Sequence, residues 1–154
     1  MVCQKENISL DRLGIININI IRKIQKECNE TIWSKESLTH LFQDGSGSGF
    51  ILFNELLPAG YIMLRSLSRE VEVLSFGVIP LFRRNGFGLI LLQEVERFII
   101  SNKKSQLMLE VSINNFTALS FYRSAGFKEI KILKNYYKTD KGRQDGLLLS
   151  KLYI

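Results

Sequence analysis

The sequence predicts a single mixed α/β domain in which helices cover both faces of one layer of β-sheet. Segments with helical and strand-like periodicity follow one another in the order helix, helix, three strands, helix, strand, helix, two strands. This order is typical of a sheet flanked by helices. The length of 154 residues fits one domain, and no internal repeat divides the chain.

Two helices are expected first. Residues 9–28 have apolar side chains at near-helical spacing, and Asp11 is the expected N-cap. Those apolar residues are Leu13, Ile16, Ile20 and Ile24. Residues 33–42 predict a second helix, with Ser34 as its N-cap and Glu36 in its first turn, where the helix dipole favours a carboxylate.

Three strand-like runs come next, separated by Pro58 and by the polar stretch around Ser68. The runs are residues 50–56, 59–67 and 70–79. The glycine-rich segment 44–49 in front of them is expected to be a flexible turn. A phosphate-binding P-loop would need a Lys-Ser or Lys-Thr pair after it, and none follows.

The second half of the chain alternates between helices and strands. The expected segments are a helix over residues 87–102, a strand over 106–113, a short helix over 114–126, and strands over 127–133 and 146–154. The long helix has an apolar stripe of Leu89, Leu92, Val95 and Ile99. An Asn caps the short helix and Gly126 closes it, and residues 134–145 are expected to form a loop.

The composition excludes several classes of protein. With 45% hydrophobic and 23% charged residues it is ordinary for a soluble globular domain. No run of 18 or more apolar residues predicts a transmembrane helix, and the first residues lack the layout of a signal peptide. Cys3 and Cys28 form no CxxC pair, and a single histidine leaves no plausible zinc set. A cytoplasmic protein without a metal or a membrane contact is expected.

The net charge of +6 is concentrated near the C-terminus. From Arg123 onward, eight Lys and Arg residues stand against three acidic ones. Such a segment favours anionic partners, among them RNA, ribosomes and a phosphorylated coenzyme. A solvated basic face explains the charge equally well.

Residues 83–88, Arg-Arg-Asn-Gly-Phe-Gly, lie between a strand-like run and the start of the long helix. They do not form a Rossmann loop, because Leu91 stands where the third glycine would be, and they lack the P-loop pattern. Backbone N–H groups in such a turn, together with the helix dipole, suit a pyrophosphate, and glycines at 86 and 88 would allow its close approach. A plain turn that needs positive φ remains the alternative for this hexamer alone.

The neighbouring segments favour the first interpretation. Together, "SFGVIP", "LFRRNGFGLILL" and "LEVSINNFTALSFYRSAGF" resemble the GNAT superfamily of acetyl-CoA-dependent N-acetyltransferases. The turn matches the superfamily signature [QR]-x-x-G-x-[GA], and the third segment matches its second diagnostic block. The resemblance covers residues 58–135 by motif and the whole chain by element order. It implies one GNAT domain over residues 1–154, with a mixed, mostly antiparallel sheet of six to seven strands and about four helices. Acetyl-CoA is the implied co-substrate.

The C-terminal third is similar to the bacterial ribosomal-protein-alanine N-acetyltransferases, which modify the N-terminal alanine of the eighteenth small-subunit ribosomal protein. The matching positions are Trp33, Ser34, Asn135, Tyr136, Tyr137, Gly142, Arg143 and Asp145. Two positions depart from the family: Ile32 replaces a common proline, and Ile79 replaces an acidic residue. The resemblance implies a ribosomal protein N-terminus as the substrate, with no direct contact to nucleic acid.

Two catalytic residues are implied. Glu110 is a carboxylate in an otherwise apolar strand, where alternation places it opposite Leu107, Leu109 and Val111. Half-buried, it would have a raised pKa and take a proton from an ammonium. Residue type alone favours a glutamate on a solvent-facing side of the strand, but the resemblance reverses this, because Glu110 stands at the family's general-base position. Tyr122 would be a core residue by pattern alone, and the family match makes it the acid that protonates the leaving thiolate.

The resemblance also implies the residues that bind the coenzyme. They are Phe76, Gly77, Val78, Arg83, Arg84, Asn85, Gly86, Phe87, Gly88, Leu89 and Asn115. In the superfamily this strand splays from its neighbour at a bulge, so the Val78 N–H is expected to polarise the acetyl carbonyl. Gly77 suits such a bulge, or is only a weak point in the strand. Asn115 could bond the coenzyme or only cap its helix.

Tyr136 and Tyr137 are expected to frame the incoming peptide N-terminus, with Trp33 on the same side or as a core anchor between the first two helices. Two alternatives stay open. One is a GNAT enzyme for another protein or a small amine. The other is a basic RNA-binding module, although no RNA-recognition run of the form [KR]-G-[FY]-[GA]-F occurs.

Overall fold

The computed structural model describes residues 7–153, so that Cys3 and the last residue of the expected C-terminal strand lie outside the described part. The strands are β1 (Ile8–Arg12), β2 (Gly47–Asn54), β3 (Leu57–Ser66), β4 (Glu70–Val78), β5 (Gln106–Ser112), β6 (Lys128–Thr139) and β7 (Gly142–Leu152). The helices are α1 (Ile18–Glu27), α2 (Lys35–Gln43), α3 (Phe87–Ser101) and α4 (Phe116–Ser124). Short 3₁₀ turns, η2 (Ile15–Asn17) and η3 (Pro80–Phe82), precede α1 and α3.

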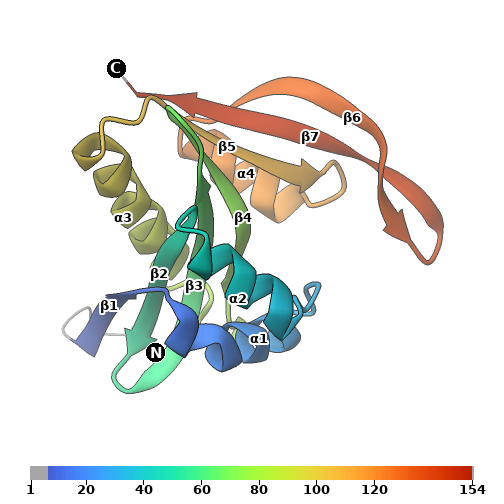
Figure 1. Ribbon diagram of the computed structural model, residues 1–154. Helices are drawn as coiled ribbons and strands as arrows, with labels where there is room; N and C mark the ends of the chain where they lie inside the picture. Colours follow the sequence, from blue (N-terminus) through green and yellow to red (C-terminus); the bar gives the residue numbers. More distant parts are fainter. Residues whose placement is uncertain (1–6, 154) are drawn as a thin grey trace.

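The seven strands form one sheet in the order β1-β2-β3-β4-β5-β7-β6 (Figure 1). Every neighbouring pair is antiparallel except β4 and β5, which run parallel. The predicted fold class, a mixed and mostly antiparallel sheet with helices on both faces, is confirmed.

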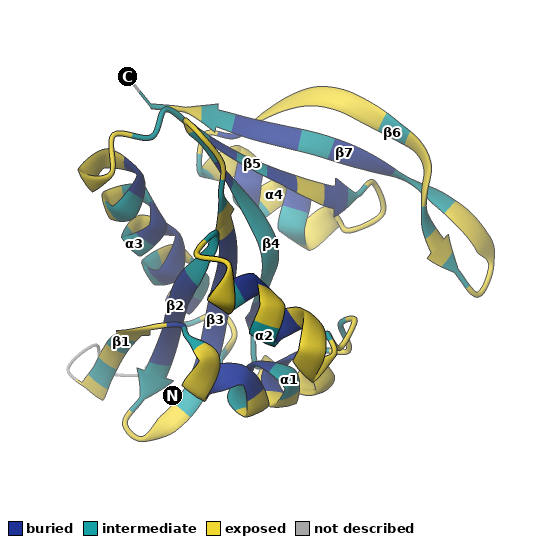
Figure 2. Cartoon of the chain, in the orientation of Figure 1, coloured by how far each residue is buried: buried dark blue, intermediate teal, exposed yellow. Residues whose placement is uncertain are grey.

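Each face of the sheet has its own hydrophobic core (Figure 2). On one face, α3 and α4 pack against the sheet around buried residues such as Leu91, Val95 and Leu119. On the other face, α1 and α2 pack around Ile21 and Leu38. The helices of the second layer cover only β2, β3 and part of β4, so the same face of β5, β7 and β6 carries no helix (Figure 1).

The first helix was predicted to start too early. Residues 8–12 form β1 on the edge of the sheet, where Asp11 pairs with Ile51 of β2, so Asp11 is not a helix N-cap. Alternation explains the strand, because Ile8 and Leu10 pack against the core while their neighbours face solvent. Ile16, expected on the apolar stripe, is 92% exposed in the 3₁₀ turn before α1.

Two other boundaries differ from expectation. Pro58 lies inside β3, and Gly47 and Gly49 of the expected turn belong to β2. A Cβ on Gly47 would stand 2.5 Å from the Leu41 side chain of α2, and one on Gly49 would stand 2.9 Å from the Leu13 side chain. These glycines therefore let β2 run directly beneath the neighbouring segments.

The ends of α2 and α3 were predicted well, because their signals are local. Ser34 caps α2 by accepting a hydrogen bond from the Ser37 N–H at 3.1 Å. The stripe of α3 is buried at Leu92, Val95 and Ile99, whereas Leu89 in the first turn is 46% exposed. No helix among residues 7–153 is both long and apolar enough to cross a membrane.

The predicted loop over residues 134–145 is instead a continuation of β6 and β7, which form a long hairpin projecting from the body of the molecule (Figure 1). Its polar and aromatic composition reflects its position, since almost every residue of β6 is exposed or half-buried on the sheet edge.

Candidate active site

The sheet opens between β4 and β5 (Figure 1). The two strands pair only where Glu70–Glu72 lie beside Gln106–Met108, and beyond that point they diverge. A β-bulge on β4 accompanies the divergence, with Leu74 as the extra residue. We call the opening the β4–β5 gap. The bulge was expected at Gly77, three residues further on, so that expectation was wrong.

Gly77 is required by close packing instead. A Cβ at this position would stand 3.1 Å from Cys28 Sγ and 3.1 Å from Glu30 Oε1. Both residues belong to the segment that follows α1, and this segment therefore lies directly on the end of β4.

Backbone donors of β4 face the gap. The Ile79 N–H bonds the Ala59 carbonyl of the neighbouring β3 at 2.8 Å, and donors alternate between the two sides of a strand. In this register the N–H groups of Phe76 and Val78 point away from β3 and toward β5. Because β5 has diverged there, these groups are available to a ligand.

The Val78 carbonyl is held by two side chains. Arg83 Nε donates to it at 2.8 Å, and the Cys28 thiol donates to it at 3.4 Å. Arg83 thus ties the turn before α3 back to the end of β4, a role that the sequence motif did not reveal.

The turn before α3 has the backbone shape of an anion site. Gly86 is the N-cap of α3 with φ +79°, and no other atom lies within 4 Å of a Cβ built there. Within the protein itself, glycine is therefore needed at this position for the left-handed backbone conformation and not for lack of space. No side chain caps the helix, so the first N–H groups of α3, from Phe87 to Leu89, are free of a capping partner. The side chain of Phe87 is buried, which leaves only its backbone to contact a ligand.

Of the other residues of the turn, Arg84 faces solvent and Asn85 faces the protein. Arg84 has φ +63° and an exposed side chain that meets no acidic partner among residues 7–153. Asn85 is turned inward and donates to the Phe82 carbonyl at 3.1 Å. A Cβ on Gly88 would make only ordinary contacts, the nearest 3.6 Å from Phe76, so the protein alone does not exclude alanine there.

Tyr122 reaches the gap from the α3 and α4 side. Its ring packs against Phe76, Phe121 and Phe127, and the residue is only 8% exposed. Burial first, and then the charge of Glu30, raise the pKa of Tyr122 above its ordinary value, so the phenol keeps its proton at neutral pH. Both the predicted core position and proximity to the gap are thus observed.

Glu110 lies on the opposite face, in a cavity of about 350 Å³ that we call the tyrosine cavity. The cavity is lined by Arg65, Glu72, Val73, Leu74, Met108, Leu109, Glu110, Tyr136, Tyr137 and Leu148. The predicted alternation of β5 is confirmed, with Leu107, Leu109 and Val111 buried. Glu110 itself is exposed rather than half-buried, because no helix covers this part of the sheet.

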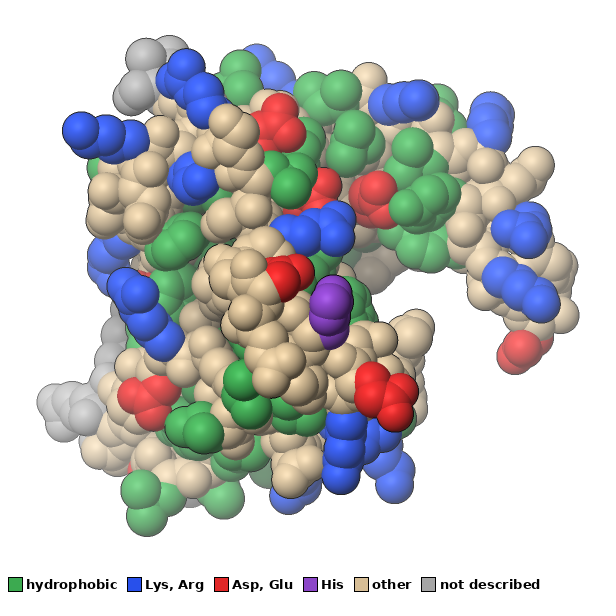
Figure 3. All heavy atoms as spheres, in the orientation of Figure 1, with side chains coloured by type: hydrophobic (Ala, Val, Ile, Leu, Met, Phe, Trp, Pro, Cys, Tyr) green, Lys and Arg blue, Asp and Glu red, His purple; other side chains and the backbone are tan. Residues whose placement is uncertain are grey.

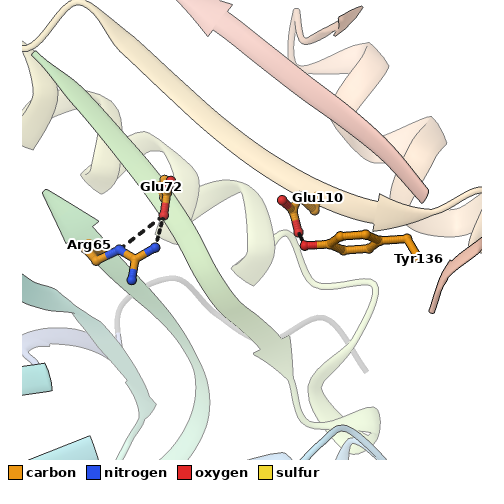
Figure 4. A network of polar contacts seen from close by, with 4 residues as sticks. All are labelled: Arg65, Glu72, Glu110 and Tyr136. Carbon is orange, nitrogen blue, oxygen red and sulfur yellow. Dashed lines mark hydrogen bonds and ion pairs between the residues drawn. The ribbon is translucent and has the colours of Figure 1, made fainter. Parts of the chain in front are cut away.

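The polar groups of the tyrosine cavity form two pairs on either side of the gap (Figure 4). The Tyr136 hydroxyl donates to Glu110 Oε2 on the β5 side. On the β4 side, Arg65 Nη2 forms an ion pair with Glu72 at 2.7 Å. This ion pair had no signal in the sequence, because its partners meet only through the pairing of β3 with β4.

A large bulge in β6 turns Tyr136 and Tyr137 into the cavity. Three residues of β6 oppose the single residue Asp145 of β7. The Asp145 carboxylate accepts from the Asn135 N–H at 2.9 Å and lies 3.6 Å from Lys134 Nζ. Burial first, and then the charge of Glu110, raise the pKa of Tyr137 to about 12.

Gly146 of β7 completes the bulge. A Cβ on Gly146 would stand 2.8 Å from the ring of Tyr137, so only glycine leaves room for that ring. Arg143 Nη1 donates to the Asn135 carbonyl at 3.3 Å, so the matching positions Asn135, Arg143 and Asp145 meet at this bulge.

Two expected residues have structural partners. Asn115 caps α4 by accepting from the Ala118 N–H at 3.2 Å. Trp33 packs against the core under α1 and α2. Its backbone N–H donates to Gln25 Oε1 at 2.9 Å, and its backbone carbonyl accepts from Arg22 Nε at 2.9 Å. The structure thus places Trp33 as an anchor of the segment between α1 and α2.

The face that carries α1 and α2 is hollowed between these helices and the β6–β7 hairpin (Figure 3). Lys and Arg side chains are spread over it rather than gathered in one patch (Figure 3). Among residues 7–153, no group of three or more His, Cys, Asp or Glu side chains is placed to hold a metal ion.

Comparison with known proteins agrees with this geometry. The acetyltransferase (GNAT) family profile matches residues 18–127. The [ribosomal protein bS18]-alanine N-acetyltransferase of Escherichia coli K12 is 27% identical over 131 residues, which cover 82% of this chain and 85% of that protein. An N-alpha-acetyltransferase of Sulfolobus acidocaldarius is 36% identical over 73 residues, or 47% of this chain and 44% of that protein.

Solved structures share the fold. The crystal structure of the ribosomal-protein-S18-alanine N-acetyltransferase from Escherichia coli superposes with a TM-score of 0.88 at 24% identity, covering 94% of this chain and 93% of that one. Arabidopsis thaliana Naa50 in complex with the bisubstrate analogue CoA-Ac-MVNAL superposes with a TM-score of 0.81 at 22% identity, covering 96% and 99% of the two chains.

Proposed function

Since this chain belongs to the acetyltransferase (GNAT) family, we propose that it transfers the acetyl group of acetyl-CoA to the N-terminal α-amine of a protein, an alanine at the start of a small-subunit ribosomal protein. The observation that carries the proposal is the β4–β5 gap, which has an uncapped helix N-terminus on one side and the tyrosine cavity with Glu110 on the other. The bS18-alanine N-acetyltransferase of Escherichia coli, similar over most of both chains, supports the choice of acceptor.

The residues present fit acetyl-CoA. Free N–H groups at the start of α3 suit its pyrophosphate, because they present several donors at the positive end of a helix. The unpaired N–H groups of Phe76 and Val78 suit the pantetheine amides and the acetyl carbonyl. The exposed Arg84 adds positive charge beside the turn. Bound there, acetyl-CoA would supply an activated thioester.

The proton transfers are assigned to two side chains. Glu110 takes a proton from the acceptor ammonium, directly or through water, and Tyr136 holds its carboxylate in place. Tyr122 gives its proton to the leaving thiolate. Its burial raises the pKa of its phenol, and the same surroundings make a thiolate more basic, so the donor and acceptor remain matched.

The acceptor is inferred from the chemistry of amines. At pH 7.5 roughly a quarter of an N-terminal α-amine is neutral, but only about a thousandth of a lysine amine is, since their pKa values are near 8 and 10.4. A single exposed carboxylate such as Glu110 manages the first amine far more readily. The rings of Tyr136 and Tyr137, 5.1 Å apart and nearly perpendicular, are expected to frame a backbone amine with a small first side chain.

A panel of acceptors tests this function. The protein with acetyl-CoA should acetylate a peptide that begins with alanine and carries the ribosomal protein sequence. The same peptide with a blocked terminus and a free lysine, and a polyamine such as spermidine, should react much more slowly. Mass spectrometry with fragment-ion localisation reads the outcome. Faster modification of the blocked peptide or of the polyamine would show that the acceptor is another protein amine or a small amine.

A further inference from the structure

Glu30 is a carboxylate that the proposed chemistry has not used, although it lies at the β4–β5 gap. It follows α1 and is half-buried. Its Oε2 accepts a hydrogen bond from the Tyr61 hydroxyl at 3.2 Å. Its Oε1 lies 3.1 Å from the point where a Cβ on Gly77 would stand. Glu30 is therefore fixed against β4 one residue before Val78, the proposed donor to the acetyl carbonyl.

Three hydroxyl and carboxylate groups form a chain at this place. Tyr61 of β3 is fully buried, and its hydroxyl bonds both Glu30 and Ser75. When Tyr61 donates its one proton to Glu30, the Ser75 hydroxyl donates to Tyr61. Ser75 follows the bulge residue Leu74, which lines the tyrosine cavity. Glu30, Tyr61 and Ser75 do not line the cavity themselves, but Ser75 is the neighbour in β4 of a residue that does.

The charged and titratable groups around Glu30 come from four elements. They are Cys28 after α1, Tyr61 on β3, Arg83 in the turn before α3 and Tyr122 on α4. Arg83 makes no ion pair with Glu30, and its Nε is bonded to the Val78 carbonyl, but its positive charge lowers the pKa of Glu30. The charge of Glu30 reaches Tyr122, which approaches from the opposite face. The carboxylate thus acts on the same opening as the proposed acid.

Burying a carboxylate is costly unless its charge is paired and hydrogen-bonded. Burial is the largest effect on Glu30 and raises its pKa, while the Tyr61 hydroxyl, the charge of Arg83 and the Ser75 hydroxyl lower it in part. A segment that only needed anchoring to Tyr61 would be served as well by a neutral glutamine, whose side-chain oxygen accepts the same hydrogen bond. A carboxylate this close to Gly77 and Val78 suits a cationic ligand in the gap as well as the charge of Arg83.

We propose that Glu30 is a second carboxylate of the acceptor site, placed opposite Glu110, and that it holds the α-ammonium of the incoming protein N-terminus beside the end of β4. Tyr61 and Ser75 fix Glu30 in this position. Glu110 then removes the proton, so Glu30 positions the amine without carrying the proton away. This inference rests on the proposed function, because it requires an amine acceptor in the tyrosine cavity.

A binding measurement without turnover tests the role of Glu30. In the presence of saturating CoA, which cannot react, two peptides are compared by calorimetry: one that begins with alanine, and one in which a propanoyl group replaces the alanine and removes only the amine. The wild-type protein should bind the amine peptide more tightly. Glu30→Gln should reduce this preference about tenfold, which corresponds to about 1.4 kcal/mol, while binding of the propanoyl peptide stays the same.

Glu27→Gln is the matched control, because it removes an exposed carboxylate three residues away and should leave the preference unchanged. Tyr61→Phe keeps the charge but releases Glu30, so it should reduce the preference partially, and it decides the question if Glu30→Gln does not fold. An unchanged preference in the folded variants would overturn the role of Glu30. If wild type acetylates no N-terminal amine in the acceptor panel, the proposed function fails instead, and the role of Glu30 fails with it.

Discussion

Glu110 and Tyr122 approach the same opening in the sheet from opposite faces, and this arrangement separates their surroundings. Tyr122 lies in the aromatic core under α4, where burial raises the pKa of its phenol. Glu110 lies in the open tyrosine cavity, where Tyr136 donates a hydrogen bond to it. A protonated group on one side and a carboxylate on the other suit an acid and a base that act at successive steps.

Removing the two groups should therefore have different pH signatures. Glu110→Gln should lower turnover by about 100-fold or more near pH 7. The loss should shrink above pH 9, because an α-amine with a pKa near 8 is then neutral without help. Tyr122→Phe should also lower turnover, without that recovery. Steady-state rates from pH 6.5 to 9.5, with acetyl-CoA affinity measured in parallel, check both. Near-normal rates in both variants would refute the assignment.

The sequence predicted the placement of single residues where the signal is local. The alternation of β5 placed Glu110 opposite the buried Leu109 and Val111, and the structure agrees. It did not predict the placement of Glu30, which arises from contacts with Tyr61 and Gly77, 31 and 47 positions away. No pattern within the segment after α1 indicates those contacts, since they depend on how α1 packs on the sheet.

The turn before α3 joins backbone geometry to the expected coenzyme site. Gly86 adopts a left-handed conformation that costs other residues roughly 1–2 kcal/mol, and its surroundings are open. A side chain there would strain the turn and cover the free N–H groups of α3. Arg83 ties the same turn to β4, so the turn and the gap form one unit.

Gly86→Val should weaken acetyl-CoA binding by at least about tenfold, or about 1.4 kcal/mol. The open space around Gly86 means that the protein should still fold. Calorimetric titration with CoA, together with a thermal unfolding curve, separates the two effects. Normal coenzyme affinity in a folded variant would show that the glycine serves only the turn.

The bulge in β6 is the second element that shapes the site. Asp145 fixes it through Asn135 and Lys134, and the bulge in turn orients Tyr136 toward Glu110. The sequence indicated these residues only through resemblance. Their placement in a loop was wrong because a bulge interrupts alternation without interrupting the strand.

Asp145→Ala should release the bulge and disorder the acceptor side alone. We expect the KM for the acceptor peptide to rise about fivefold or more, since a lost hydrogen bond to a charged group is worth about 1.5–3 kcal/mol. The acetyl-CoA affinity should not change, because Asp145 contacts Asn135, Lys134 and the Ile113 backbone rather than the turn before α3. Lys141→Ala in the hairpin turn is the matched control. Equal changes for both substrates would contradict a role confined to the acceptor.

The whole molecule can be described as two parts of one sheet that separate at β4 and β5. One part carries α1 and α2 on the face where the other part is bare, and this difference leaves the hollow that contains the tyrosine cavity (Figure 3). On the opposite face, α3 and α4 share a continuous core across both parts. The proposed coenzyme and acceptor sites therefore lie on different faces and meet at the gap.

The sequence predicted this architecture in outline, since helix and strand periodicity is strong in α3 and in β3 to β5. It missed the edge strand β1, because five residues give too short a pattern. The near-helical spacing of Leu13, Ile20 and Ile24 extended the predicted helix back over residues of β1. Periodicity alone did not predict the gap, which is set by how far β4 and β5 stay paired; the resemblance implied that this strand splays from its neighbour. Strand pairing between distant segments leaves no local signature.

The most direct test of the account is a crystal structure of the protein with a conjugate of CoA joined through an acetyl bridge to a peptide that begins with alanine. The pyrophosphate should lie against the N–H groups at the start of α3, and the bridge should lie in the β4–β5 gap near Val78. The alanine nitrogen should lie between Glu110 and Glu30, with the peptide between Tyr136 and Tyr137. A conjugate bound away from the gap, or a peptide that leaves the tyrosine cavity empty, would contradict the account.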